Sequence, residues 1–393
     1  MLKILKNGFC QYVIKRTFIT NDTVNTSVYG NQSLWAVKFW RSYNNSNQNG
    51  IVNQQYATLQ TAKNMTKNTK KSSSDFQQEH AAEKFREEVF KGLGNIPKRL
   101  QSKYFYDETG DALFQQIMEM PEYYLTRCEL DIFQNRTADL VNVITKQETA
   151  FDLIELGAGD ATKSSYLLQY LVEQKADFTY MPIDISGHIL EILDEKIKAG
   201  LPDLEVVCLE GEYFTMLQKA TKISKRRKVV MFLGGNIGNM EKEEALGFCR
   251  ELRSNLNIGD IALIGFDLKK HPQTILNAYN DKAGITSAFN LNLLSRMNAE
   301  LDSDFDVEQF EHYQNYDPLT GACKSYLISL RQQQVKISDT HIDFDKNEAI
   351  YMEVSQKFSA DDIQKLAHQS GFLIMEEVGD SKNWFTDSLW IAE

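Results

Sequence analysis

Two short stretches decide how this sequence folds: FDLIELGAGD at residues 151–160 and MFLGGNIGNM at residues 231–240. Each begins with a run of apolar residues, which is typical of a buried strand, and each ends in glycines that favour a turn. Glycine has no Cβ, so a backbone can approach another group closely there. Two buried strands with glycine tips therefore predict a sheet that binds a ligand at one edge.

The sequence around these stretches alternates between strand and helix patterns from about residue 150 to residue 268. Short apolar strands are expected at FDLIEL, FTYMPIDI, LEVVCLEG, KVVMFLG and DIALIGFDL, with amphipathic helices between them. This alternation is typical of an α/β protein whose parallel sheet is covered by helices on both faces. In such sheets ligands bind at the carboxyl ends of the strands.

The last 120 residues have a different pattern, typical of an α+β region. We expect a helical stretch over 272–300, antiparallel strands in KSYLISLRQQQVKI, HIDFD and AIYMEVSQKFS, and a turn at ISDTHID. A helix at DDIQKLAHQS and strands at FLIMEEVG and DSLWIAE end the chain. This region should elaborate the sheet and cover its ligand-binding edge.

Residues 1–75 differ in composition from the rest. They contain ten Lys and Arg but only two acidic residues, and they are rich in Asn, Gln, Ser and Thr. We expect most of this extension to be disordered. Its basic opening, MLKILKNGFCQYVIKRTFIT, also resembles a transit peptide, so organelle targeting by residues 1–30 is the alternative. Met65 offers another possible start.

Composition narrows the class of function. The remaining 318 residues carry 33 basic and 52 acidic side chains, a balance that disfavours nucleic acid as a partner. No run of 18 apolar residues predicts a membrane span. The five cysteines are scattered without a C-x-x-C pair, and no histidine motif predicts a metal site. We therefore expect a cytoplasmic protein without metal, a monomer because heptads are lacking, and a small molecule as its partner.

Polar residues at successive strand ends point to a nucleotide-like cofactor. Gly157 and Gly159 follow the first strand, Asp184 ends the second, and Glu212 and Tyr213 follow the third. An acid can accept hydrogen bonds from ribose hydroxyls, and the Glu-Tyr pair suits the edge and ring of adenine. A plain turn between strand and helix is the alternative for the G-x-G motif alone.

The residues favour S-adenosylmethionine over NAD as the cofactor. A dinucleotide site requires G-x-G-x-x-G/A, but Thr162 occupies the last position, and Asp160 would face a phosphate with a negative charge. S-adenosylmethionine has no phosphate and carries a positive sulfonium. Acidic residues beside the glycine turn then become favourable.

Five longer motifs carry a resemblance to a known family. They are YFYDETGDALFQQIMEMPEYYLTR, ELGAGDATKS, FLGGNIGN, AYNDKAGITSAFN and MEVSQKF. In this order and spacing they resemble the histidine-specific N-alpha-methyltransferases of ergothioneine biosynthesis, over residues 76–393. The resemblance implies trimethylation of the α-amino group of L-histidine to give hercynine. It also implies a Rossmann-like class I methyltransferase sheet over 128–270, with a smaller α+β substrate-binding domain built from 76–127 and 271–393.

The resemblance also assigns site residues. It implies that S-adenosylmethionine is bound by Gly157, Lys163, Asp184, Glu212 and Tyr213, where the compared member has Asp-Phe at the last two positions. It implies that Tyr106, Phe114 and Tyr123 line the amino-acid pocket, that Gly234, Asn239 and Tyr279 hold the α-amino and carboxylate groups, and that Glu353 and Ser355 hold the imidazole. Tyr106, Tyr123 and Asn239 are the catalytic candidates. Ser325 departs from the family, which has methionine there.

The residue types fit these roles, although each has a simpler alternative. A tyrosine of pKa about 10 is a weak base at neutral pH, so Tyr106 and Tyr123 should position the acceptor, and their rings suit an alkylammonium. Core packing is the alternative. Asn239 can donate and accept, or can serve a local turn. Glu353 and Ser355 are two apart on a strand and share a face, which could instead be a solvated polar face.

Two other functions remain open. Ser325 motivates an N-methyltransferase that acts on a different amino acid or a small amine. A cofactor-binding protein without catalysis is the other reading. The set of Asn239, Tyr279, Glu353 and Ser355 disfavours it, because a sensor needs no acceptor pocket.

Overall fold

The structure is a computed structural model that describes residues 73–393, of which residues 85–393 form one compact unit. The first described element is the helix α4 (Ser73–Leu93). The predicted extension 1–75, with its transit-peptide alternative and Met65, lies outside the described residues except for its last three, which belong to α4. In the described part, no helix has the length and apolar character needed to cross a membrane.

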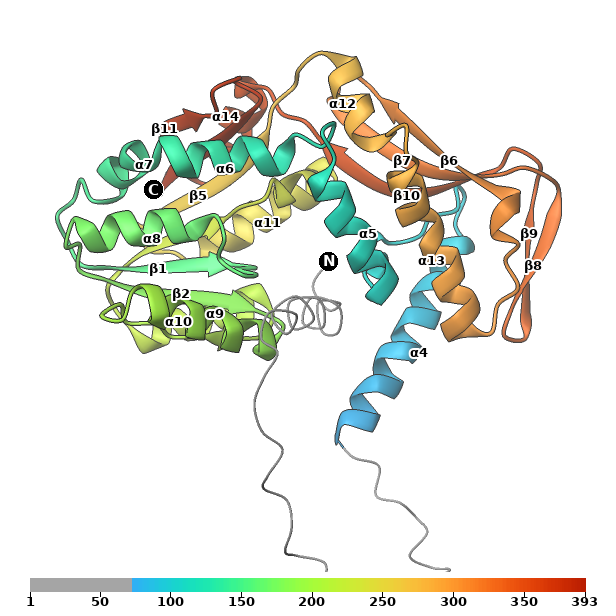
Figure 1. Cartoon of the computed structure of the whole chain (residues 1–393), viewed down its shortest axis with the longest axis horizontal. Coiled ribbons are helices and arrows are strands. Elements are labelled where there is room, and N and C mark those ends of the chain that lie inside the picture. The colour runs from blue at the N-terminus through green and yellow to red at the C-terminus, as the bar shows by residue number, and fades with distance from the viewer. Residues whose placement is uncertain (1–72) are drawn as a thin grey trace, which may run out of the picture. The chain divides into compact units, whose positions relative to one another are not determined.

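A seven-stranded sheet forms the larger half of this unit (Figure 1). Its strands are β1 (Phe151–Leu156), β2 (Phe178–Asp184), β3 (Leu209–Glu210), β4 (Arg227–Phe232), β5 (Ile261–Asp267), β11 (Phe372–Gly379) and β12 (Phe385–Ala392). Their order is β11-β12-β5-β4-β1-β2-β3, with β1 to β5 parallel, β12 antiparallel to β5, and β11 antiparallel to β12. The predicted α/β class is confirmed. The chain order reverses between β1 and β4, which is where such sheets bind ligands.

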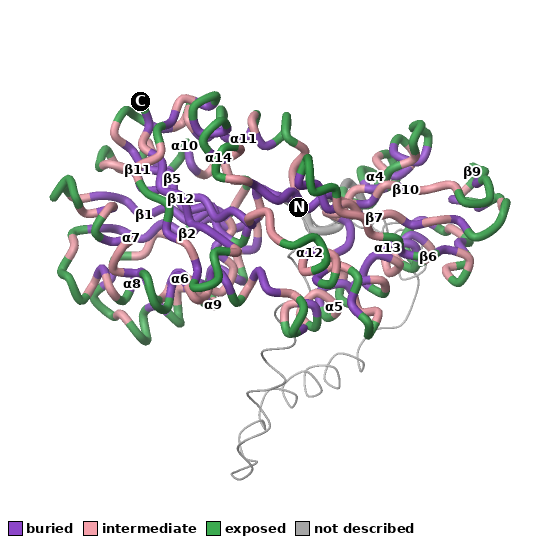
Figure 2. The backbone as a smooth tube through the Cα atoms, turned by 90° about the horizontal axis from the view of Figure 1, so that it is seen from above, coloured by how far each residue is buried: buried purple, intermediate pink, exposed green. Residues whose placement is uncertain are grey.

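Helices cover both faces of this sheet. One face packs against α6 (Leu125–Asn135), α7 (Thr137–Ile144), α8 (Ser164–Glu173) and α9 (Gly187–Gly200), and the other against α10 (Tyr213–Ile223), α11 (Lys242–Ser254) and α14 (Ala360–Gln369). Successive strand residues point to opposite faces, so Leu153 joins the first core and Ile154 the second. Figure 2 shows the central strands, among them β1, β2, β5 and β12, as buried, whereas the edge strand β11 is partly exposed. Burial on both faces explains why the strands read as largely apolar runs.

The second half surrounds a three-stranded antiparallel sheet. Its strands are β6 (Phe310–Tyr316), β7 (Ala322–Ser329) and β10 (Ala349–Gln356), in the order β10-β7-β6, and β8 (Gln333–Ile337) and β9 (Thr340–Phe344) form a separate hairpin. The helices here are α4, α5 (Glu108–Glu119), α12 (Pro272–Tyr279) and α13 (Ile285–Leu301), with short 3-10 helices at Ser102–Tyr104 and Val307–Gln309. A third core joins these elements except α12, whose Ala278 belongs to the first core of the larger half. The predicted turn at ISDTHID is the β8–β9 turn.

Several details differ from the sequence predictions. The helical stretch over 272–300 is broken between α12 and α13, because the Asp281 carboxylate accepts from the N–H groups of Ile285 (2.9 Å) and Thr286 (2.8 Å) and starts a new helix. Strand β6 was not predicted, and β3 has only two residues. The predicted division places β11 and β12 with the substrate-binding part, yet β12 pairs along β5. By sheet pairing, residues 372–393 therefore belong with the larger sheet, and the rest of the domain division stays a prediction.

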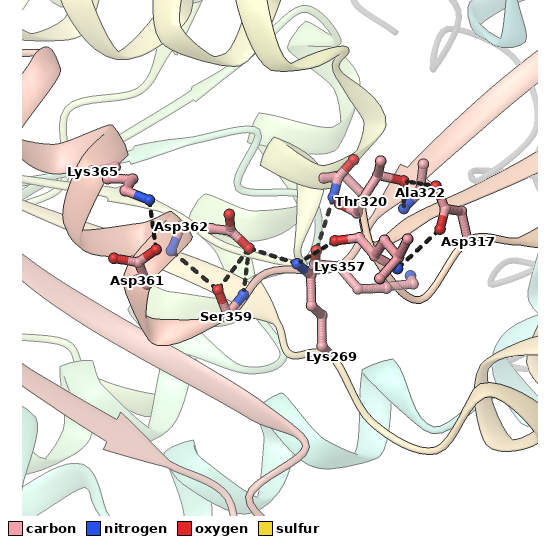
Figure 3. A network of polar contacts seen from close by, with 11 residues as sticks. Lys269, Asp317, Thr320, Ala322, Lys357, Ser359, Asp361, Asp362 and Lys365 are labelled. Atoms are coloured by element: carbon pink, nitrogen blue, oxygen red, sulfur yellow. Dashed lines mark hydrogen bonds and ion pairs between the residues drawn. The ribbon is translucent and has the colours of Figure 1, made fainter.

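The segment that follows β10 links the two sheets. Phe358 N–H donates to the Asp267 carbonyl at the end of β5 (2.9 Å), and Lys269 N–H donates back to the Phe358 carbonyl (2.8 Å). Figure 3 shows Lys269 reaching from this junction to Asp362 of α14 (2.9 Å) beside the β6–β7 turn. These contacts hold the end of β10 against the carboxyl-terminal edge of the larger sheet.

Candidate active site

The predicted cofactor residues meet at the tips of β1, β2 and α10. Gly157 has φ +75°, which favours glycine, and a Cβ there would lie 2.6 Å from the Tyr213 hydroxyl, so a side chain at this position would displace Tyr213. Asp184 is buried and accepts from the N–H groups of Ser186 (2.9 Å) and Gly159 (3.4 Å). Burial raises the pKa of Asp184 above its ordinary value.

Glu212 and Tyr213 start α10 beside this group. Glu212 is the exposed N-cap residue, and Tyr213 is the first residue of the helix. Burial raises the pKa of Tyr213, and the charges of Asp184 and Glu212 add to the effect, which places all three side chains in one neighbourhood. The strand tips thus bring Gly157, Asp184, Glu212 and Tyr213 together.

Lys163, the fifth predicted cofactor residue, belongs to a buried ionic group that sequence reasoning missed. Its Nζ pairs with Glu129 of α6, and the other oxygen of Glu129 accepts from Gly234 N–H at 2.6 Å. Burial lowers the pKa of Lys163, but Glu129, Asp387 and Glu155 together outweigh burial and the pKa is raised. Asp387 of β12 lies nearby, and burial followed by the charge of Glu129 raises its pKa well above the ordinary value. No local pattern marks Glu129 or Asp387.

The predicted acceptor residues form an aromatic group. The rings of Tyr123 and Tyr279 meet edge to face at 6.0 Å, and those of Tyr106 and Phe114 do so at 5.5 Å. Phe289 of α13 packs against both Tyr106 (5.5 Å) and Phe114 (5.8 Å) and was not predicted. Phe114 joins this aromatic group through its ring contacts with Tyr106 and Phe289. Tyr106 and Tyr123 also lie close to a charged group, the carboxylate of Glu353.

Glu353 and Ser355 face this group from β10, as their spacing predicts. Ser355 Oγ lies 2.7 Å from Tyr279 Oη, and Glu353 is near enough to raise the pKa values of Tyr106 and Tyr123, for which burial is the larger cause. Burial also raises the pKa of Glu353 to about 7, with a Ser102 hydrogen bond acting in the opposite direction. Met352 and Val354, on the opposite side of the strand, are buried.

The tip of β4 lies between the predicted cofactor residues and the predicted acceptor residues. It continues into a 3-10 helix (Asn236–Asn239), and Asn239 and Glu353 both line a cavity of about 480 Å³. The position of a Cβ on Gly238 would be 2.8 Å from the Gln356 carbonyl oxygen at the end of β10. At the other end of the tip, a Cβ on Gly234 would be 3.7 Å from Lys163 Nζ. The two sets of predicted residues therefore adjoin.

Lys357 is a further residue of the acceptor group that sequence reasoning missed. It is fully buried, and its Nζ donates to Tyr279 Oη, Ser355 Oγ and Asp267 Oδ2, each at 2.7 Å. A sequence signal existed, because Lys357 continues the two-residue spacing of Glu353 and Ser355. Its partner Asp267 ends β5, and no pattern in the sequence connects the two.

Comparison with known proteins identifies the family of this chain. The family model described as histidine-specific methyltransferase, SAM-dependent, matches residues 85–392. Histidine N-alpha-methyltransferase of Mycolicibacterium smegmatis is 33% identical over 309 residues, covering 78% of this chain and 92% of that protein. The protein of the same name from Mycobacterium tuberculosis is 33% identical over 275 residues, covering 70% and 84%. Ergothioneine biosynthesis protein 1 of Schizosaccharomyces pombe is 27% identical over 285 residues, covering 71% and 37%. With its sheet order and adjoining residue groups, the chain belongs to the histidine-specific, S-adenosylmethionine-dependent methyltransferase family.

Proposed function

We propose that this chain transfers three methyl groups in succession from S-adenosylmethionine to the α-amino nitrogen of L-histidine. The product is hercynine, and the reaction is a step of ergothioneine biosynthesis. The observation that carries the proposal is the tip of β4, where Gly234 lies beside Lys163 and Gly238 lies beside the end of β10. A cofactor and an acceptor bound in the two groups would meet there.

The cofactor residues fit S-adenosylmethionine. Gly157 has no Cβ, which makes room for the Tyr213 hydroxyl at the strand tip, and the buried Asp184 offers a carboxylate for ribose hydroxyls. Tyr213 supplies a ring and Glu212 an acceptor for the adenine. Bound S-adenosylmethionine supplies an electrophilic methyl group on a positively charged sulfur. Asp184, Glu212 and Tyr213 favour such a cation and would disfavour the phosphates of a dinucleotide.

The acceptor residues position the amine rather than deprotonate it. A tyrosine with a pKa well above its ordinary value keeps its proton, so Tyr106 and Tyr123 act as hydroxyl partners and as ring faces for the growing alkylammonium. The amine loses its proton to water before each transfer, since only a neutral nitrogen has a lone pair to attack. Asn239 then orients it, and such positioning supplies much of the rate.

The direct test is turnover of the purified chain with L-histidine and S-adenosylmethionine, followed by mass spectrometry. We expect mono-, di- and trimethylated histidine in succession, with trimethylated product last. Absence of methylated histidine would overturn the proposal. So would a crystal of the ternary complex with S-adenosylhomocysteine in which the α-nitrogen points away from the sulfur.

One observation favours a second candidate, an N-methyltransferase with a different acceptor. Ser325, where the compared family has methionine, is buried and lies directly opposite Glu353 in the β7–β10 ladder. A smaller side chain there leaves more room beside the imidazole position. Competition between L-histidine and other L-amino acids in the same assay distinguishes the two, because a preferred acceptor other than histidine would support this candidate.

Cytoplasmic location and a monomeric state remain predictions from the sequence. Light scattering of the purified full chain tests the oligomeric state. Microscopy of the tagged full chain, with the tag at the C-terminus, tests whether residues 1–30 direct it to an organelle instead.

A further inference from the structure

Three alternating side chains at the end of β10 place an acidic group and a basic group on opposite sides of the predicted histidine pocket. Glu353, Ser355 and Lys357 lie two residues apart and share one side of the backbone. Ser355 bonds to Lys357, and Glu353 is close enough to raise the pKa of Tyr279, although burial is the main cause. The carboxyl group stands at one end of this row and the ammonium group at the other.

The ammonium group of Lys357 is held by groups from both sheets. Lys357 Nζ pairs with Asp267 Oδ2, while the other oxygen of Asp267 is bound by Lys270 Nζ. Tyr124 Oη also donates to Asp267, at 2.9 Å. Burial lowers the pKa of Lys270, with Asp267 acting against this and Lys357 adding to it. The Lys357 ammonium group lies between the Asp267 carboxylate and the hydroxyls of Tyr279 and Ser355, and it donates to all three. This geometry does not depend on the charge of Lys270.

Counting hydrogens shows what this arrangement leaves for a ligand. An ammonium group has three donors, and those of Lys357 serve Asp267, Tyr279 and Ser355. Lys357 therefore has no hydrogen left for a ligand. Tyr279 and Ser355 each have one hydroxyl hydrogen, and their mutual bond of 2.7 Å uses one of the two. One hydroxyl hydrogen remains, on an oxygen that already accepts from a cation and is therefore a stronger donor.

That remaining donor suits an anion. If Ser355 donates to Tyr279, the free hydrogen is on Tyr279, and Ser355 keeps an acceptor site for an imidazole N–H. A histidine would then lie with its carboxylate at Tyr279 and its imidazole between Ser355 and Glu353. The negative charge of Glu353 opposes the reverse orientation, because it would repel the carboxylate.

We propose that Lys357 is a positioning residue for the acceptor's α-carboxylate, acting through the hydroxyls of Tyr279 and Ser355. It makes the enzyme select amino acids over the amines that lack the carboxylate. The inference rests on the proposed function and adds to it Lys357 as the residue that helps to recognise the α-carboxylate of the amino acid.

The test compares L-histidine with histamine, which is histidine without its carboxylate. Binding of both is measured by calorimetry in the presence of S-adenosylhomocysteine, for the wild type, Lys357→Met and Lys357→Arg. A hydrogen bond to a charged group corresponds to about a 10- to 100-fold change in affinity. We expect Lys357→Met to weaken histidine binding by this factor and to change histamine binding little. Lys357→Arg, which keeps the charge, should recover part of the preference.

The control is Lys365→Met, the same change at an exposed lysine of α14 that pairs with Asp361 in Figure 3. It should leave both affinities unchanged. An equal loss for histidine and histamine in Lys357→Met, with binding of S-adenosylhomocysteine retained, would overturn the inference, because a merely structural role affects both ligands alike.

A second variant covers the case in which Lys357→Met fails to fold. Tyr279→Phe keeps the ring and removes the hydroxyl through which Lys357 acts, so it should also lose the preference for histidine over histamine. An undiminished preference would overturn the inference. Failure of the proposed function is a different result, in which the wild type neither binds nor methylates histidine. In that case, Lys357 is tested with another amino acid that the wild type binds, compared with the amine that lacks its carboxylate.

Discussion

At the scale of single residues, the acceptor group depends on the ionisation of Glu353. Burial raises the pKa of this carboxyl group to about 7, close to that of a free imidazole at about 6.5. The two groups can therefore share one proton, with either partner carrying it. In contrast, Tyr106, Tyr123 and Tyr279 keep their protons, because burial raises each pKa well above the ordinary value.

Glu353→Gln should weaken histidine binding by about 10- to 100-fold, because a hydrogen bond to a charged group is lost. Binding of S-adenosylhomocysteine should stay unchanged. Glu311→Gln, the same change at an exposed position of β6, is the matched control. Calorimetry with each ligand measures both effects, and unaltered histidine binding in the Glu353→Gln variant would contradict the assignment of the pocket.

The pH dependence of histidine binding should also change in Glu353→Gln. Glu353 and the ligand's imidazole share one proton, so affinity falls on the acid side, where Glu353, with its pKa of about 7, and the imidazole are both protonated. The ligand's imidazole titrates at about pH 6.5 with both proteins, so the contribution of Glu353 is the part of the acid-side loss that is present in the wild type and missing from the variant. The comparison is made by calorimetry across the neutral range, and parallel profiles for the two proteins would show that Glu353 does not pair with the ligand.

Asp184→Asn tests the cofactor group at the same scale. Ser186 N–H and Gly159 N–H donate to different oxygens of the carboxylate, so the amide can accept from only one of them, and it also loses the charge offered to ribose hydroxyls. We expect S-adenosylhomocysteine to bind about tenfold more weakly or worse. Asp203→Asn, at an exposed site after α9, should have no effect on cofactor binding. Equal cofactor affinities for the two variants would remove Asp184 from the site.

At the scale of elements, the β6–β7 turn supports the active site through the end of β10. Lys357 N–H donates to the Gly321 carbonyl at 2.7 Å. Gly321 has φ +80°, and a Cβ there would lie 2.2 Å from the Lys357 carbonyl oxygen and 2.6 Å from Lys269 Cε. The turn and the β10 end therefore fit together only when this residue is glycine.

Gly321→Ala should be compared with Gly284→Ala, which has φ +75° but open space around it. The left-handed backbone alone costs roughly 1–2 kcal/mol for alanine. The Gly321→Ala variant should lose about 1–3 kcal/mol more in the free energy of unfolding, because the crowded neighbours must move. Chemical denaturation measures both. Equal losses would show that the close approach to Lys357 adds nothing.

At the scale of the whole molecule, the two ends of the parallel strands in the larger sheet have different roles. The carboxyl ends of its parallel strands carry the predicted site, while the opposite edge carries a fully buried ion pair between Lys228 of β4 and Asp152 of β1 (2.7 Å). Lys228 Nζ also donates to the carbonyls of Ser224 (3.0 Å) and Arg226 (2.6 Å). This pair lies at the starts of the strands, away from the tips, and should affect stability alone.

Asp152→Ala should cost about 3–5 kcal/mol in the free energy of unfolding, because it leaves a buried charge without its partner. Asp177→Ala removes an exposed partner of Arg226 at the same edge and should cost little. Below its unfolding temperature, the Asp152→Ala variant should bind S-adenosylhomocysteine like the wild type. A large loss of cofactor affinity in the folded variant would contradict the separation of the two edges.

The sequence by itself determined the parallel sheet and the positions of its tips. Burial on both faces requires continuous apolar runs, and close ligand approach requires glycine, so both features are visible within a few residues, as at Gly157 and in GGNIGN. Spacing along one strand likewise placed Glu353 and Ser355 on one face. The roles of these residues came from resemblance and remain predictions.

Only the tertiary structure decided which groups meet across elements. Lys357 finds Asp267 and Tyr279, Glu129 finds Lys163 and Gly234, and β12 pairs with β5. Each of these contacts joins residues far apart in the chain, whereas periodicity reports only which side of its own element a residue occupies. A buried charge is tolerated only beside its partner, and folding alone brings that partner into place.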